Sequence, residues 1–177
     1  MIGSEPNGII AVFPTAAKAD AALHALLDSG FDMQGVTVLG PGRPKGDDVP
    51  PELDRGKEHS IEVAKYWARW GGIIGAGLGL ALIGIPAIAA VVGLGAFAPL
   101  LAAVPAVTTA SGALGTALIG LGVHEGHAAR YEHALAEGKI VVLAHADDRI
   151  VLTEARDVLA AHAPEVIDVH GLRKLTA

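Results

Sequence analysis

The sequence contains no cysteine, and only 4% of its 177 residues are aromatic. The absence of cysteine excludes disulfides and thiol chemistry, although it does not assign a compartment. The net charge of −6 at pH 7 argues against a nucleic-acid partner, because binding to nucleic acid depends on accumulated lysine and arginine. The first residues have neither a basic nor an apolar segment, so no cleaved secretory signal is expected.

Charge is missing from one long stretch of the chain. Residues 70–123 include no Asp, Glu, Lys, Arg or His across 54 positions. A bilayer needs roughly 20 apolar residues for each helical crossing, so this length fits two crossings and a turn. We therefore predict a transmembrane helical hairpin with its turn at residues 95–99. Basic residues flank the run on both sides, which predicts a protein of the cytoplasmic membrane with both termini in the cytoplasm and with lipid as a partner.

The few aromatic residues gather where the predicted hairpin begins. Tyr66, Trp67 and Trp70 lie beside Lys65 and Arg69. Aromatic rings next to basic side chains are typical of the boundary between a membrane and water. We therefore assign Tyr66, Trp67 and Trp70 to the membrane interface.

Small residues recur at intervals of four in both arms of the predicted hairpin. They are Gly71, Gly75 and Gly79 in the first arm and Thr108, Gly112, Thr116 and Gly120 in the second. Residues at this spacing share a helix face, and small side chains let two helix backbones approach closely. The faces join either the two arms of one chain or, in addition, neighbouring chains. We favour the second alternative, which predicts a homo-oligomer.

The segments on either side of the apolar run predict an α/β pattern. Strands are expected at residues 8–13, 35–39, 139–144 and 166–170, with helices at 16–27 and from Asp147 or Asp148 onward. Two such β-α-β units predict an α+β fold of the ferredoxin-like type, interrupted by the hairpin. The domain boundaries follow: a first β-α-β unit and linker over 1–59, an interfacial helix and hairpin over 60–123, and the second half of the α/β domain over 124–177.

One further helix, from residue 124 to about 137, carries a group of polar side chains. His124 and His127 are three positions apart, and Tyr131 lies on the same helical face as His127. Two imidazoles at this spacing can chelate a metal ion, but the sequence shows no third ligand. We therefore predict neither a metal nor another cofactor. The chain also has no nucleophile elbow and no phosphate-binding loop, so no catalytic residue is assigned.

Several segments together resemble a known family. They are residues 10–13 with the helix at 16–27, the glycine-rich block from Gly71, and the stretch from Arg130 through residues 138–142 to Asp148. In these patterns the chain is similar to the bacterial general-stress and low-temperature-induced glycine-rich membrane proteins of unknown function. It departs from them at residues 122–125, where the proline of their usual turn is missing. The resemblance implies a membrane location and an association with stress, and it implies no catalytic residues.

These observations predict a non-enzymatic, membrane-associated scaffolding protein that oligomerises through its glycine-rich hairpin. The alternative is a membrane-anchoring subunit of a larger enzyme complex. Pro86 and Pro105 lie inside the predicted arms, where proline removes a backbone donor and kinks a helix. Kinked arms would leave room between the helices, so in the alternative the hairpins enclose a chamber for a lipid or a quinone.

Overall fold

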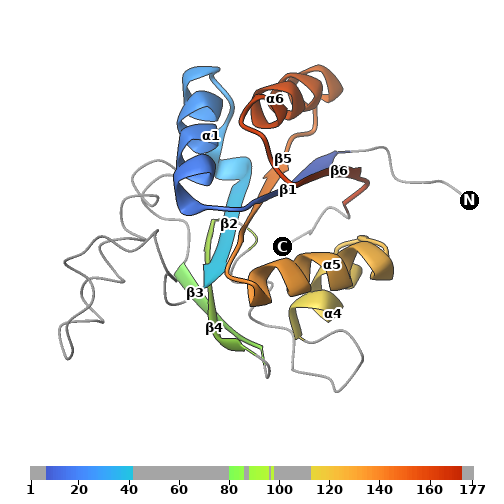
Figure 1. Cartoon of the computed structure of the whole chain (residues 1–177). Helices are drawn as coiled ribbons and strands as arrows, with labels where there is room; N and C mark the ends of the chain where they lie inside the picture. Colours follow the sequence, from blue (N-terminus) through green and yellow to red (C-terminus); the bar gives the residue numbers. More distant parts are fainter. Residues whose placement is uncertain (1–6, 42–79, 86–87, 96, 98–112, 173–177) are drawn as a thin grey trace, which may run out of the picture.

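A computed structural model describes residues 7–41, 80–85, 88–95, 97 and 113–172. These residues form one antiparallel sheet with the strand order β3-β4-β2-β5-β1-β6, together with α-helices and one short 3₁₀ helix (Figure 1). The strands are β1 (Gly8–Phe13), β2 (Val36–Pro41), β3 (Leu80–Ile85), β4 (Ile88–Gly95), β5 (Ile140–His145) and β6 (Val166–His170). The helices are α1 (Ala16–Asp28), η1 (Met33–Gly35), α4 (Ala113–Gly120), α5 (Glu125–Ala136) and α6 (Arg149–Ala161).

The helix boundaries follow from local sequence. The Thr15 hydroxyl accepts a hydrogen bond from the Lys18 backbone N–H at 3.3 Å, and Asp148 accepts one from the Ile150 N–H at 2.7 Å. Each side chain satisfies a backbone donor that a helix start leaves unpaired. Gly30 and Gly138 follow α1 and α5 with φ angles of 82° and 87°, a conformation that glycine adopts without a steric penalty. The predicted strands and helices of the α/β segments are therefore confirmed to within a few residues.

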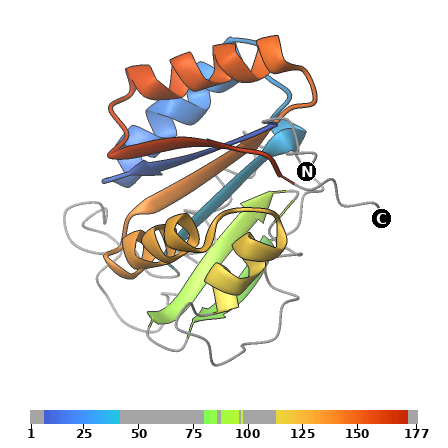
Figure 2. The same ribbon diagram turned by 90° about the vertical axis from the view of Figure 1, so that its right-hand side faces the viewer.

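Helices cover both faces of the sheet. Figures 1 and 2 show α1 and α6 on one face and α4 and α5 on the other. The first face buries apolar side chains of α1 and α6 against β1, β2 and β5, and the second buries those of α4 and α5 against the same strands. All six residues of β1 are buried, as expected for a strand with apolar side chains on both faces.

The apolar run does not form the predicted membrane hairpin. Its described residues instead form β3, β4 and α4, and β4 pairs with β2 so that the sheet is extended beyond β2. None of the helices in the described ranges is long and apolar enough to cross a membrane. This finding corrects the transmembrane part of the predicted fold and the membrane-protein class, and it removes the support for the cytoplasmic membrane location. The term ferredoxin-like remains a prediction.

The error has a physical cause. The prediction used the length of the run and its lack of charge, but an apolar stretch without charge is equally compatible with buried strands. The described part of this run includes β3 and β4, whose backbone groups pair with each other. The backbone of β4 also pairs with β2. Gly95, assigned to a turn between helices, instead ends β4 opposite Thr37. Its φ of 124° and the collision that an added Cβ would make with the Val36 carbonyl oxygen both require glycine there.

Candidate metal site

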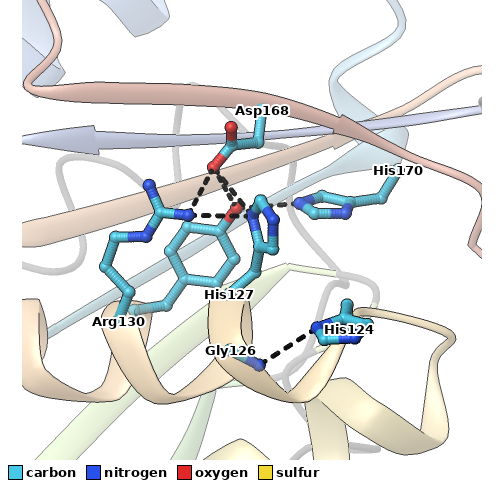
Figure 3. A network of polar contacts seen from close by, with 7 residues as sticks. His124, Gly126, His127, Arg130, Asp168 and His170 are labelled. Carbon is cyan, nitrogen blue, oxygen red and sulfur yellow. Dashed lines mark hydrogen bonds and ion pairs between the residues drawn. The ribbon is translucent and has the colours of Figure 1, made fainter.

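Two elements that are distant in sequence bring a group of polar side chains together. His127 and Arg130 point from α5 toward Asp168 and His170 of β6 (Figure 3). At the start of α5, the ring Nδ1 of His124 accepts a hydrogen bond from the Gly126 backbone N–H at 3.3 Å. His124 therefore caps the helix, while His127, one turn later, faces the strand.

The register of β6 explains why Asp168 and His170 face α5. Asp168 pairs with Ile10 of β1, and His170 pairs with Gly8. Side chains of paired residues share one face of a sheet, and Ile10 belongs to the core on the α4 and α5 side. Because residues two apart on a strand also share a face, Asp168 and His170 both project toward α5.

Tyr131 forms the inner wall of this group. Its side chain is fully buried, and its hydroxyl lies 2.9 Å from Asp168 Oδ2 and 2.8 Å from His170 Nε2. An ionised carboxylate can only accept hydrogen bonds, so the phenol donates its proton to Asp168. The phenol oxygen must then accept from His170, which places a proton on Nε2 of that imidazole. A single hydroxyl thus determines the tautomer of His170.

His127 has two alternative partners for one nitrogen. Its Nδ1 lies 3.2 Å from Asp168 Oδ2 and 3.1 Å from Arg130 Nη2. With a proton on Nδ1 the ring donates to Asp168, and without that proton Nδ1 accepts from Arg130. In the second tautomer this nitrogen has a lone pair that faces the carboxylate of Asp168. That lone pair and the carboxylate are both suited to bind a cation.

The local environment sets the protonation states of Tyr131, His170 and Asp168. Burial, aided by the hydrogen bond to Asp168, raises the pKa of Tyr131, so the phenol stays protonated at neutral pH. Burial also lowers the pKa of His170, which favours the neutral imidazole. Partial burial opposes ionisation of Asp168, but hydrogen bonds from Tyr131 and His127 outweigh it and lower the pKa of the carboxyl. The result is one carboxylate beside a neutral imidazole and a neutral phenol.

His127, Asp168 and His170 have the donor types and the spacing of a metal site. One ligand atom from each residue can be chosen so that all three lie within 4.8 Å of one another, and all three residues are partly buried. Ligand atoms around a tetrahedral zinc ion are about 3.3 Å apart, because the bonds are about 2.0–2.1 Å long. The 3.2 Å between His127 Nδ1 and Asp168 Oδ2 already matches that separation. To bind a metal ion through Nε2, His170 must move its proton from Nε2 to Nδ1. The imidazole remains neutral in this exchange of tautomers.

The residues assigned from sequence to helix packing lie elsewhere. Thr116 and Gly120 are on α4, and a Cβ added to Gly120 would meet no atom within 4 Å. No other described element therefore packs closely against the face of α4 on which a Gly120 side chain would lie. The other assigned residues lie outside the described ranges: Gly71, Gly75, Gly79, Thr108, Gly112, Tyr66, Trp67 and Trp70. Oligomerisation through these positions remains a prediction.

The sequence indicates the part of the candidate site on α5 but not the part on β6. The helical spacing of His127 and Tyr131 was recognised, but Asp168 is 41 positions from His127 and its proximity depends on the fold. One pattern was available: Asp168 and His170 alternate on a predicted strand, which places both side chains on one face. The sequence did not show which helix that face would meet.

Comparisons with known proteins assign no family, because no protein-family model, no curated protein and no solved structure matches this chain. The fold and the site define its class as an α+β protein with helices on both faces of the sheet and a His, Asp and His group between α5 and β6. The similarity to the stress-associated membrane proteins remains a prediction.

Proposed function

We propose that this protein is a non-enzymatic binding protein for a divalent first-row transition-metal ion, held by His127, Asp168 and His170. One observation carries the proposal: α5 and β6 bring three ligand groups within 4.8 Å of one another. Two imidazoles and one carboxylate form a ligand set that suits zinc and ferrous iron. A structural role for the same group, as a hydrogen-bonded tether between helix and strand, is the alternative.

The surroundings of the three residues support metal binding. Metal ligands must be deprotonated on the coordinating atom, and the lowered pKa values of Asp168 and His170 favour the ionised carboxylate and the neutral imidazole. Tyr131 donates a hydrogen bond to Asp168, which is how groups around a metal site commonly orient its ligands. Because Tyr131 is buried, that orientation is maintained by the core.

Arg130 is a neighbour whose charge opposes a bound cation. Its Nη2 lies 3.8 Å from Asp168 Oδ2, so its positive charge competes for the same carboxylate. The Arg130 side chain is 47% exposed, however, and an exposed arginine can turn into water at little cost. Metal binding therefore displaces the contacts of Arg130 with His127 and Asp168 at the surface. If His170 binds through Nε2, it also replaces the hydrogen bond between that nitrogen and the Tyr131 hydroxyl.

The functions predicted from sequence are not proposed again. Both the membrane scaffold and the membrane anchor with a lipid or quinone chamber depended on a helical hairpin, which the described part of the apolar run does not form. No contact in the described part of the chain tests the homo-oligomer or the larger enzyme partner, and both remain predictions.

Metal titration of the full-length protein, prepared without a histidine tag, tests the proposal. We expect one Co²⁺ per chain with a ligand-field absorption band, and competition by Zn²⁺. Asp168→Asn and His127→Gln should each weaken binding by at least tenfold, because each removes a ligand. His133→Gln is the matched control, since His133 lies on the same helix, is exposed and pairs with Glu137 instead. Equal binding by the wild type and Asp168→Asn, or no binding at all, would overturn the proposal in favour of the structural tether.

A further inference from the structure

Arg130 is a cation that contacts two residues of the candidate metal site. Its Nη2 lies 3.1 Å from His127 Nδ1 and 3.8 Å from Asp168 Oδ2. A guanidinium has five N–H donors in a planar fork, so these two contacts engage only one edge of the group. The remaining donors are on a side chain that is 47% exposed.

Metal binding would remove both of these contacts. The metal takes the lone pair of His127 Nδ1, which is the acceptor that Arg130 now uses. The metal would also take the charge of Asp168, whose carboxylate lies 3.8 Å from Arg130. The guanidinium would then face a divalent cation, and the carboxylate of Asp168 would no longer be free to neutralise it. A small anion that contacts both would neutralise this excess of charge.

Among the described residues, the side of the site formed by His127 and Arg130 is partly exposed to solvent. The side chains of His127 and Arg130 are 36% and 47% exposed, whereas Tyr131 is fully buried and closes the inner side. Three protein ligands leave at least one position of a four-coordinate metal ion for water or another ligand. The partly exposed side chains of His127 and Arg130 would let solvent and small solutes reach a metal ion held by these three residues.

From these observations we infer that the metal-loaded site binds a small oxyanion, either a carboxylate or a phosphate group, between the metal ion and Arg130. The inference rests on the proposed function, because the anion contacts the metal. The planar fork of arginine matches the two oxygens of a carboxylate or phosphate, so Arg130 supplies geometry as well as charge. The oxyanion displaces a water from the metal, and no covalent bond in the protein changes.

The test uses the full chain loaded with Co²⁺, in a non-coordinating buffer at constant ionic strength. Acetate and inorganic phosphate are titrated in separate arms, and the ligand-field spectrum reports a change in the coordination of Co²⁺. We expect at least one of the two anions to shift the spectrum in a saturable manner. The two arms distinguish a carboxylate ligand from a phosphate ligand.

Variants of Arg130 separate its role from that of the metal. Arg130→Gln should weaken anion binding at least tenfold while Co²⁺ binds as tightly as in the wild type or more tightly, because a competing cation is gone. Arg130→Lys keeps the charge without the fork and should recover part of the anion affinity. Arg156→Gln is the control, since Arg156 lies on α6 beside Asp157.

The two proposals fail in distinguishable ways. If Co²⁺ binds at the three residues but neither anion alters the spectrum, the oxyanion inference is overturned and the proposed function stands. The oxyanion inference is also overturned, with the proposed function intact, if Arg130→Gln binds the anions as tightly as the wild type. If Co²⁺ does not bind at these residues, both proposals are overturned.

Discussion

The two faces of the sheet are stabilised in different ways. On the α1 and α6 face, apolar side chains form a buried cluster. On the α4 and α5 face, the core includes Tyr131, whose hydroxyl is bonded to Asp168 and His170 of β6. In the described residues, packing of apolar side chains stabilises the first face, whereas the second adds a polar link between α5 and the edge strand β6.

The largest expected effect is the loss of packing on the apolar face. Leu23 of α1 is fully buried, and Leu23→Ala should lower the free energy of unfolding by about 2–5 kcal/mol, because it removes buried methyl groups and leaves a cavity. Urea denaturation followed by circular dichroism measures the change. Leu27→Ala is the matched control on the same helix, where the side chain is 42% exposed and the loss should be below about 1 kcal/mol. Equal losses at both positions would contradict the assigned packing.

A smaller effect is expected from breaking the polar link on the other face. Tyr131→Phe keeps the ring but removes the hydroxyl that joins Asp168 to His170, and it should cost about 1–3 kcal/mol. The same denaturation experiment applies, with Asp168→Asn and the double variant completing a mutant cycle. We expect the two losses to be less than additive, because both substitutions break one shared contact. Strict additivity would show that Tyr131 and Asp168 act independently.

The third prediction concerns pH, measured with a chelator present. Burial, aided by the charge of His127 and opposed by that of Asp168, lowers the pKa of His170 in the folded protein. As pH falls through about 6.5, the unfolded chain takes up a proton at this residue before the folded chain does, so the stability that His170 contributes is lost. His170→Gln retains an N–H donor for Tyr131 but does not titrate. The wild type should therefore lose more stability than this variant between neutral and mildly acidic pH. Parallel curves would contradict the assigned environment.

The smallest effect has the opposite sign. Gly120 lies in α4 with open space where a Cβ would be placed, so Gly120→Ala should raise stability by about 0.4–1 kcal/mol through the reduced freedom of the unfolded chain. Thermal unfolding measures the gain, and the mass of the assembly in solution is recorded alongside. A loss of stability together with a smaller assembly would instead show that Gly120 packs closely against another chain, as the small-residue spacing predicted.

Local sequence determined the elements of the α/β segments. The β-branched run at residues 8–13, the caps Thr15 and Asp148, and the glycines after α1 and α5 each act within a few residues, and the structure places strands and helices where they indicate. Such features are predictable because the chemistry that decides them lies within one turn or one strand.

Tertiary structure decided the form of the apolar run and the composition of the site. Residues 80–95 are apolar enough for either a helix or strands. In the structure β4 pairs with β2, which lies about fifty positions or more away along the chain. Asp168 and His170 face α5 because the register of β6 against β1 points them there, and α5 packs on that same side of the sheet. The sequence by itself determined which residues can bind a proton or a metal ion. Their proximity depends on long-range pairing and packing, whose free energy is distributed over the whole sheet and is not encoded in any short stretch of the chain.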